Sequence, residues 1–144
     1  MRKIMKVQIE GVLENQSLAR AISAAYAGEA DPTIEEIIEI KTAVSEAFSN
    51  ACIHGYKECT GDVYMEFGFI GRDTLMIKIS DKGVGIENIA LAMEPLFTTD
   101  KGHNRSGMGF TVMESFMDRI KVDSKVGEGT TVTLIKKLDT YYDI

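Results

Sequence analysis

The stretch from Asp81 to Gly109 places the strongest constraint on how this chain can fold. It opens with an Asp-x-Gly-x-Gly sequence at residues 81–85 and closes with Arg-Ser-Gly-x-Gly at residues 105–109. The alternating apolar run at 75–79 before it predicts a strand, and residues 108–117 after it predict a helix. Glycines at such positions let the backbone approach a phosphate chain, and a helix N-terminus offers free N–H groups and a positive dipole. The pattern predicts a nucleotide site under a mobile lid.

The alternative for each glycine pair is a simple turn, which is where a lone Gly-x-Gly is usually found. The two pairs here bracket a loop with three basic side chains, Lys101, His103 and Arg105, in an otherwise acidic chain. Neither a Gly-x-x-x-x-Gly-Lys-Ser/Thr loop nor a Gly-x-Gly-x-x-Gly turn occurs in the sequence. A nucleotide must therefore bind by another scheme.

Length and composition favour one soluble domain spanning residues 1–144. The chain is 44% hydrophobic and 26% charged, which is ordinary for a globular protein. No apolar run reaches the length of a membrane span and no signal-peptide pattern is present, so we expect a cytoplasmic protein without a membrane partner. The formal net charge of −6 disfavours direct nucleic-acid binding and favours a basic protein partner.

Periodicity predicts an α+β fold. The expected strands are residues 4–12, 63–69, 75–79, 120–122 and 130–134, and the expected helices are residues 18–28, 32–54, 87–93 and 108–117. Asp31 and Pro32 are expected to begin the second helix as N-cap and first helical residue. The hairpins imply a mixed, mostly antiparallel sheet with helices on one face, which makes a two-layer α/β sandwich.

The apolar helical positions predict which faces are buried. In the first two helices these positions are Leu18, Ala21, Ile22, Ala25, Ile34, Ile37, Ile38, Val44, Phe48, Ala51 and Cys52. In the last helix they are Val112, Met113, Phe116 and Met117.

Three polar residues form a stripe on the opposite edge of the long helix. Glu46, Asn50 and His54 follow one another at intervals of four, so their side chains stack. A solvated stripe is the ordinary explanation, but asparagine is a poor helix former and needs a reason to lie inside a helix. The Asn50 oxygen suits Mg²⁺ beside a triphosphate, and Glu46 one turn earlier suits a base that takes a proton from a hydroxyl. We expect His54 to be structural.

Taken together and in this order, Glu46-x-x-x-Asn50, Asp81-x-Gly83-x-Gly85 and Gly107-x-Gly109 resemble the ATP-binding boxes of the GHKL family of gyrases, Hsp90, histidine kinases and MutL. The resemblance covers about residues 33–134. Each box alone is weak, whereas the ordered set is highly specific.

A closer resemblance covers almost the whole chain. The segments at residues 31–33, 44–47, 50–51, 54–56, 95–99 and 105–110 resemble the family of anti-sigma F factors, also called stage II sporulation protein AB. Members of that family are small dimeric serine kinases that use ATP. They hold a sporulation sigma factor, sigma F, inactive and phosphorylate a serine of an anti-anti-sigma factor. The resemblance thus implies ATP and Mg²⁺ as cofactors, both proteins as partners, and a homodimer.

The resemblance also implies a role for individual residues. Asp81 accepts from the adenine amino group, Gly83 and Gly85 let the purine approach, Asn50 holds Mg²⁺, and Glu46 is the catalytic base. Thr131 on the last strand assists Asp81. The residues expected along the rest of the ATP are Thr98, Thr99, Arg105, Ser106, Gly107, Met108, Gly109 and Phe110.

Two other functions compete with a serine kinase. The first is a nucleotide-loaded module that sequesters its partner without transfer, and Glu46 argues against it. The second is a histidine-kinase-like catalytic domain. A sensor histidine kinase would carry a phospho-accepting histidine on a preceding helical hairpin, whereas residue 45 of this chain is serine, which argues against this function. Arg20 on the first helix is either a solvated charge or part of the surface that binds partners.

Overall fold

The computed structural model describes residues 1–56, 61–94 and 109–139. Its strands are β1 (Arg2–Glu10), β2 (Asp62–Ile70), β3 (Thr74–Asp81), β4 (Arg119–Lys125) and β5 (Gly129–Lys137). Its α-helices are α1 (Gln16–Ala27), α2 (Ile34–Asn50), α3 (Ile89–Ala92) and α4 (Gly109–Phe116). Three single turns complete it: the 3₁₀ turns Leu13–Asn15 and Gly28–Ala30, and a π-helical turn at Ala51–Gly55, here called the π-turn.

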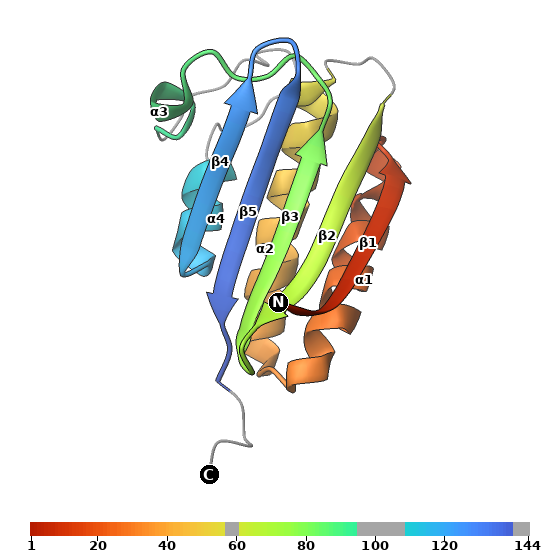
Figure 1. The fold of residues 1–144 in the computed structure, drawn as a ribbon, viewed down its shortest axis with the longest axis vertical. Helices are drawn as coiled ribbons and strands as arrows, with labels where there is room; N and C mark the ends of the chain where they lie inside the picture. The colour runs from red at the N-terminus through yellow and green to blue at the C-terminus, as the bar shows by residue number, and fades with distance from the viewer. Residues whose placement is uncertain (57–60, 95–108, 140–144) are drawn as a thin grey trace.

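The strands form one sheet in the order β1-β2-β3-β5-β4. Figure 1 shows α1, α2 and α4 on one face of this sheet, with α3 beyond its β4 edge. This arrangement confirms the predicted α+β two-layer sandwich. The sheet was expected to be mixed and mostly antiparallel, and every pair of neighbouring strands in the described residues is antiparallel. The C-terminal ends of α2 and β3 lie at the same end of the molecule (Figure 1).

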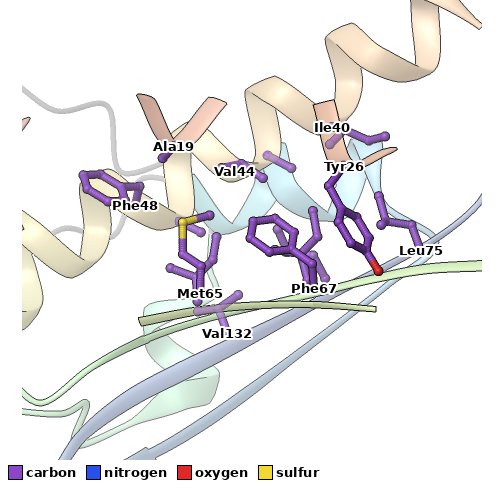
Figure 2. Packing of buried hydrophobic residues seen from close by; sticks show 14 of the residues in the cluster. Ala19, Tyr26, Ile40, Val44, Phe48, Met65, Phe67, Leu75 and Val132 are labelled. Carbon is purple, nitrogen blue, oxygen red and sulfur yellow. The ribbon is translucent and has the colours of Figure 1, made fainter. Parts of the chain in front are cut away.

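The core lies between the sheet and the helices. Alternate residues of β2, among them Met65 and Phe67, point toward α2, where Val44 and Phe48 meet them (Figure 2). Tyr26 of α1 packs with its ring centroid 5.2 Å from that of Phe67. These side chains are almost completely buried, as the period-two pattern of the strands requires. Met113 of α4 and Met117, which directly follows this helix, are buried too, which confirms that these methionines fill the core.

The buried faces of α1 and α2 differ from those predicted. On α1, Leu18 is 49% exposed, and the buried residues are Ala19, Ser23, Tyr26 and Ala27. On α2, Ile34 is 82% and Ile38 57% exposed. The prediction was wrong at these positions because an apolar side chain is free to remain at the surface, whereas small residues and a hydrogen-bonded serine can be buried at close helix contacts. It is confirmed for the second half of the long helix, where Val44, Phe48, Ala51 and Cys52 are buried.

The start of α2 also differs from the prediction. Thr33, and not Asp31, is the N-cap: its side chain accepts from the Glu36 backbone, and the Glu36 carboxylate accepts from the Thr33 backbone. Asp31 instead ends the preceding 3₁₀ turn in a left-handed conformation with φ of 51°. The other oxygen of Glu36 accepts the Asp139 backbone N–H at 2.9 Å, which fastens the chain after β5 to this helix end.

The long helix, predicted over residues 32–54, is not α-helical to its end. Its α-helical part ends at Asn50, and the π-turn follows. The Tyr56 N–H donates to the Ala51 carbonyl at 3.1 Å and closes this wider turn. Cys52 lies in it and is buried, as predicted. The π-turn carries Gly55 toward the end of β3, where the candidate site lies.

Candidate active site

Asp81 is the last residue of β3 and is only 8% exposed. The Gly83 N–H donates to its Oδ1 at 2.8 Å. Gly55 of the π-turn lies directly against the same carboxylate, because a Cβ at Gly55 would be 2.6 Å from Asp81 Cγ. The acid is thus held at the junction of β3 and the π-turn.

Burial raises the pKa of the Asp81 carboxyl above its ordinary value, and hydrogen bonds from the backbone of Gly83 and Thr130 partly offset this effect. A buried acid with a shifted pKa that can still accept a hydrogen bond is typical of a ligand site.

The two predicted glycines after Asp81 are required by close backbone contacts. A Cβ at Gly83 would lie 1.8 Å from the Gly55 carbonyl oxygen, which accepts the Val84 N–H at 2.9 Å. Gly85 has φ of 78°, and its Cβ would lie 2.4 Å from the Lys125 carbonyl oxygen. Only glycine fits both positions, so the segment after β3 can lie flat against the π-turn and the β4–β5 turn.

Glu46 and Asn50 converge on the first residue of α4. A Cβ at Gly109 would lie 3.2 Å from Asn50 Nδ2 and 3.3 Å from Glu46 Oε2. A carboxylate, an amide and the N-terminus of a helix therefore meet at one place, and the helix end contributes N–H groups that favour anions. His54, predicted to be structural, lies in the π-turn and is half-buried.

Thr131 does not lie beside Asp81 as expected. It pairs with Ser80, and their hydroxyl oxygens are 2.8 Å apart on the sheet face away from the helices. The residue opposite Asp81 is Thr130, whose Oγ1 is 2.8 Å from the Oγ of Ser124. The row Asp81, Thr130 and Ser124 crosses three neighbouring strands on the helix-covered face.

Ser124 also holds the segment after Asp81. Its Oγ accepts the Ile86 N–H at 2.8 Å. Sequence reasoning missed both Thr130 and Ser124, because hydroxyl residues stand at 130, 131 and 133 and only the register of β5 decides which face each occupies.

The chain is similar to known proteins over most of its length. The model of the histidine kinase-like ATPase domain matches residues 10–136. An anti-sigma F factor of Anoxybacillus flavithermus is 50% identical over 139 residues, which cover 96% of this chain and 94% of the relative. The chain belongs to the anti-sigma F factor family. A second anti-sigma F factor, from Clostridium acetobutylicum, is 52% identical over 133 residues, covering 92% of each chain.

A solved structure shares the fold. The crystal structure of the RsbU and RsbW domains of Rv1364c from Mycobacterium tuberculosis superimposes with a TM-score of 0.68 at 18% identity, covering 94% of this chain and 32% of that one. At this identity the likeness concerns the fold alone. The predicted GHKL fold, and the predicted place of this chain in the anti-sigma F factor family, are confirmed.

Arg20 is half-buried between α1 and α2 rather than fully solvated. Its guanidinium donates to Ser45 Oγ at 3.0 Å and to Ser17 Oγ at 3.1 Å. It lines an open groove of about 340 Å³, here called the α1–α2 groove, with Ile38, Lys41, Thr42, Ser45 and Glu46. Glu46 thus faces the N-terminus of α4 and also belongs to this groove.

The remaining predicted site residues are only partly described. Phe110 is half-buried against the core. Thr98, Thr99, Arg105, Ser106, Gly107 and Met108 lie outside the described residues, as does the predicted lid. Within the described part of the chain, no three His, Cys, Asp or Glu side chains gather as a metal site. No helix described there is both long and apolar enough to span a membrane.

Proposed function

We propose that this chain is an ATP-dependent serine kinase that also inhibits a sigma factor. Its partners are sigma F, which it binds and holds inactive, and an anti-anti-sigma factor, which it phosphorylates and thereby inactivates. The family of the chain and the names of its relatives support the anti-sigma role. The observation that carries the kinase is the convergence of Glu46 and Asn50 on the N-terminus of α4.

Base recognition falls to the Asp81 end of the site. The buried carboxylate accepts from the exocyclic amino group of adenine, and Gly83 and Gly85 leave room for the purine. Thr130 replaces Thr131 in our assignment, because its side chain lies on the same face as Asp81. Gly55, beside Asp81, lies in the π-turn that directly follows Asn50, and Asn50 lies beside the N-terminus of α4. A nucleotide whose base is bound at Asp81 would therefore direct its phosphates toward α4.

Transfer falls to the Glu46 end of the site. Glu46 takes the proton from the serine hydroxyl, the serine oxygen forms a bond with the γ-phosphorus, and the bond to the β–γ bridging oxygen breaks to leave ADP. Phosphoryl transfer depends mainly on positioning and charge neutralisation. Asn50 fits Mg²⁺, because its amide oxygen lies at the helix end where phosphates would bind, and the bound ion would neutralise phosphate charge. We assign the phosphates themselves to Thr98, Thr99, Arg105, Phe110 and the backbone from Ser106 to Gly109.

The α1–α2 groove is the proposed place where a partner protein docks. It is open and is lined by both Arg20 and Glu46, so a serine presented from this side would meet the base. Arg20→Glu should reduce sigma-factor binding at least tenfold without changing ATP affinity. Unchanged sigma binding by this variant would remove Arg20 from the partner surface.

The family resemblance further supports a homodimer that acts in the cytoplasm. Sedimentation equilibrium of the purified protein tests the first point, and a single species at the monomer mass would contradict it.

The kinase is tested with purified protein, labelled ATP, Mg²⁺ and a candidate anti-anti-sigma protein. Acid-stable label on a serine of that protein is the expected result. Acid-labile label would indicate a phosphohistidine and a histidine-kinase-like activity. Tight ATP binding without any transfer would leave a nucleotide-loaded sequestering module.

A further inference from the structure

The hydroxyl of Tyr56 lies between β2 and β3 at the end of the sheet that carries the site. It donates to the Asp62 carbonyl oxygen at 2.5 Å and accepts the Lys82 N–H at 2.9 Å. Lys82 directly follows Asp81, so this hydrogen bond fixes the backbone next to the acid assigned to adenine.

The register of the strands shows what this hydroxyl replaces. The β2–β3 ladder ends at the pair of Tyr64 and Ser80, and its continuation would place Asp62 opposite Lys82. On either side the sheet continues, because Asp62 pairs with Glu10 and Asp81 pairs with Thr130. The two strands therefore separate at this point, and the phenol bridges the backbone groups that a direct ladder bond would otherwise join.

Tyr56 is itself held from two directions. Its ring covers Gly61, where a Cβ would lie 2.3 Å from the ring Cε1, and Gly61 accepts the Gly11 N–H at 2.7 Å. Its own N–H closes the π-turn onto Ala51. The turn so closed presents Gly55 to the Asp81 carboxylate. One residue thus fixes both the acid and the backbone that faces it.

The protonation state of the phenol suits this role. Burial raises the pKa of Tyr56, and nearby Asp81 and Asp62 raise it further, while the Lys82 N–H lowers it. The hydroxyl consequently keeps the proton that it donates to Asp62.

We propose that Tyr56 is a positioning residue of the nucleotide site: by bridging the separated ends of β2 and β3, it sets the place of Asp81 and so the selectivity for adenine. The inference rests on the proposed assignment of Asp81 to the base. It concerns selectivity between bases, whereas Glu46 and Asn50 concern transfer.

The test compares Tyr56→Phe with the matched control Tyr26→Phe. The control also removes a phenol hydroxyl that donates to a backbone carbonyl at 2.5 Å, that of Lys3 on β1. We expect Tyr56→Phe to weaken ATP roughly 5- to 10-fold, the effect of one lost hydrogen bond in fold terms, and to reduce the preference for ATP over inosine triphosphate. The control should leave both values within twofold of wild type, and saturating ATP should restore the transfer rate of Tyr56→Phe.

An ATP preference equal in the two variants would overturn the role of Tyr56 while the proposed kinase stands. Absence of any ATP preference in the wild type would overturn the adenine assignment and this inference together. Hydrogen exchange of the wild type provides a measurement that needs no variant. Slow exchange of the Lys82 amide in the ligand-free protein is expected, and exchange at the rate of an exposed loop would contradict the bridge.

Discussion

Replacing Asp81 by asparagine should separate ATP affinity from protein stability. The side chain is 8% exposed, and one of its oxygens accepts the Gly83 N–H. Asparagine keeps an oxygen for that N–H but directs an NH₂ donor toward the adenine amino group, which is also a donor. The variant therefore loses the hydrogen bond to the base and gains an unfavourable contact between two donors.

The expected loss of ATP affinity follows from the charge on the carboxylate that accepts this hydrogen bond. A hydrogen bond to a charged group contributes about 1.5–3 kcal/mol, which corresponds to roughly a 10- to 150-fold rise in the dissociation constant of ATP. The free energy of unfolding, by contrast, should stay the same or increase. Burial penalises the charged form of Asp81, as its raised pKa shows, so a neutral amide should leave the ligand-free protein as stable or more stable.

Isothermal titration with ATP and with inosine triphosphate, followed by urea unfolding of the ligand-free protein, measures both quantities. Asp123→Asn is the matched control, since this acid lies on β4 with a side chain 60% exposed. The variant Asp81→Asn should lose its preference for ATP over inosine triphosphate, whose 6-oxo group can accept from the new NH₂. An unchanged ATP dissociation constant, or a loss that merely parallels lower stability, would refute the reasoning.

Three further predictions concern Gly83, Glu36 and the pH dependence that Asp81 should cause. Gly83→Ala should abolish measurable ATP binding, because its Cβ would lie 1.8 Å from the Gly55 carbonyl oxygen, whereas Gly28→Ala, with nothing within 4 Å, should bind normally; equal titration curves would contradict this. Glu36→Ala should lower the unfolding free energy by about 2 kcal/mol in urea, because its carboxylate accepts two backbone N–H groups, each at 2.9 Å; a loss below about 0.5 kcal/mol would contradict it. ATP affinity should fall as the pH drops through the raised pKa of Asp81, because the protonated carboxyl is a poor acceptor for the adenine amino group. The stability that this group contributes should instead fall as the pH rises through the same range, because the folded chain binds the proton more tightly than the unfolded chain. An ATP affinity of the wild type that does not change with pH would contradict the first part.

The strands and the order of the site motifs could be predicted from the sequence because both are local patterns. Alternating apolar residues define β2 and β3 without ambiguity, and Asp81 is the last residue of β3. The interval of four between Glu46 and Asn50 is enough to place both on one side of α2.

The rest depended on contacts between distant segments. Ile34 and Ile38 look like core residues by spacing, yet both are exposed in the part of the chain that the structure describes. Ser23 is buried in the packing of α1, where its hydroxyl donates to the Ala19 carbonyl and so has a hydrogen-bond partner without water. Thr130 and Thr131 differ by one position in β5, and a shift by one residue reverses the face of every side chain. The bridge made by Tyr56 forms only where the π-turn contacts the ends of β2 and β3, and no local sequence pattern predicts that contact.

Transfer of labelled phosphate by Glu46→Gln, with ATP binding measured on the same samples, tests the proposed kinase most directly. Glutamine keeps the size of the side chain beside Gly109 but cannot take the serine proton. We predict an ATP dissociation constant within about threefold of wild type and a rate of serine phosphorylation lower by roughly 10²–10⁴-fold, the usual contribution of a general base. Transfer at the wild-type rate by this variant would contradict the role of Glu46, and loss of ATP binding together with transfer would show that the carboxylate holds the nucleotide instead.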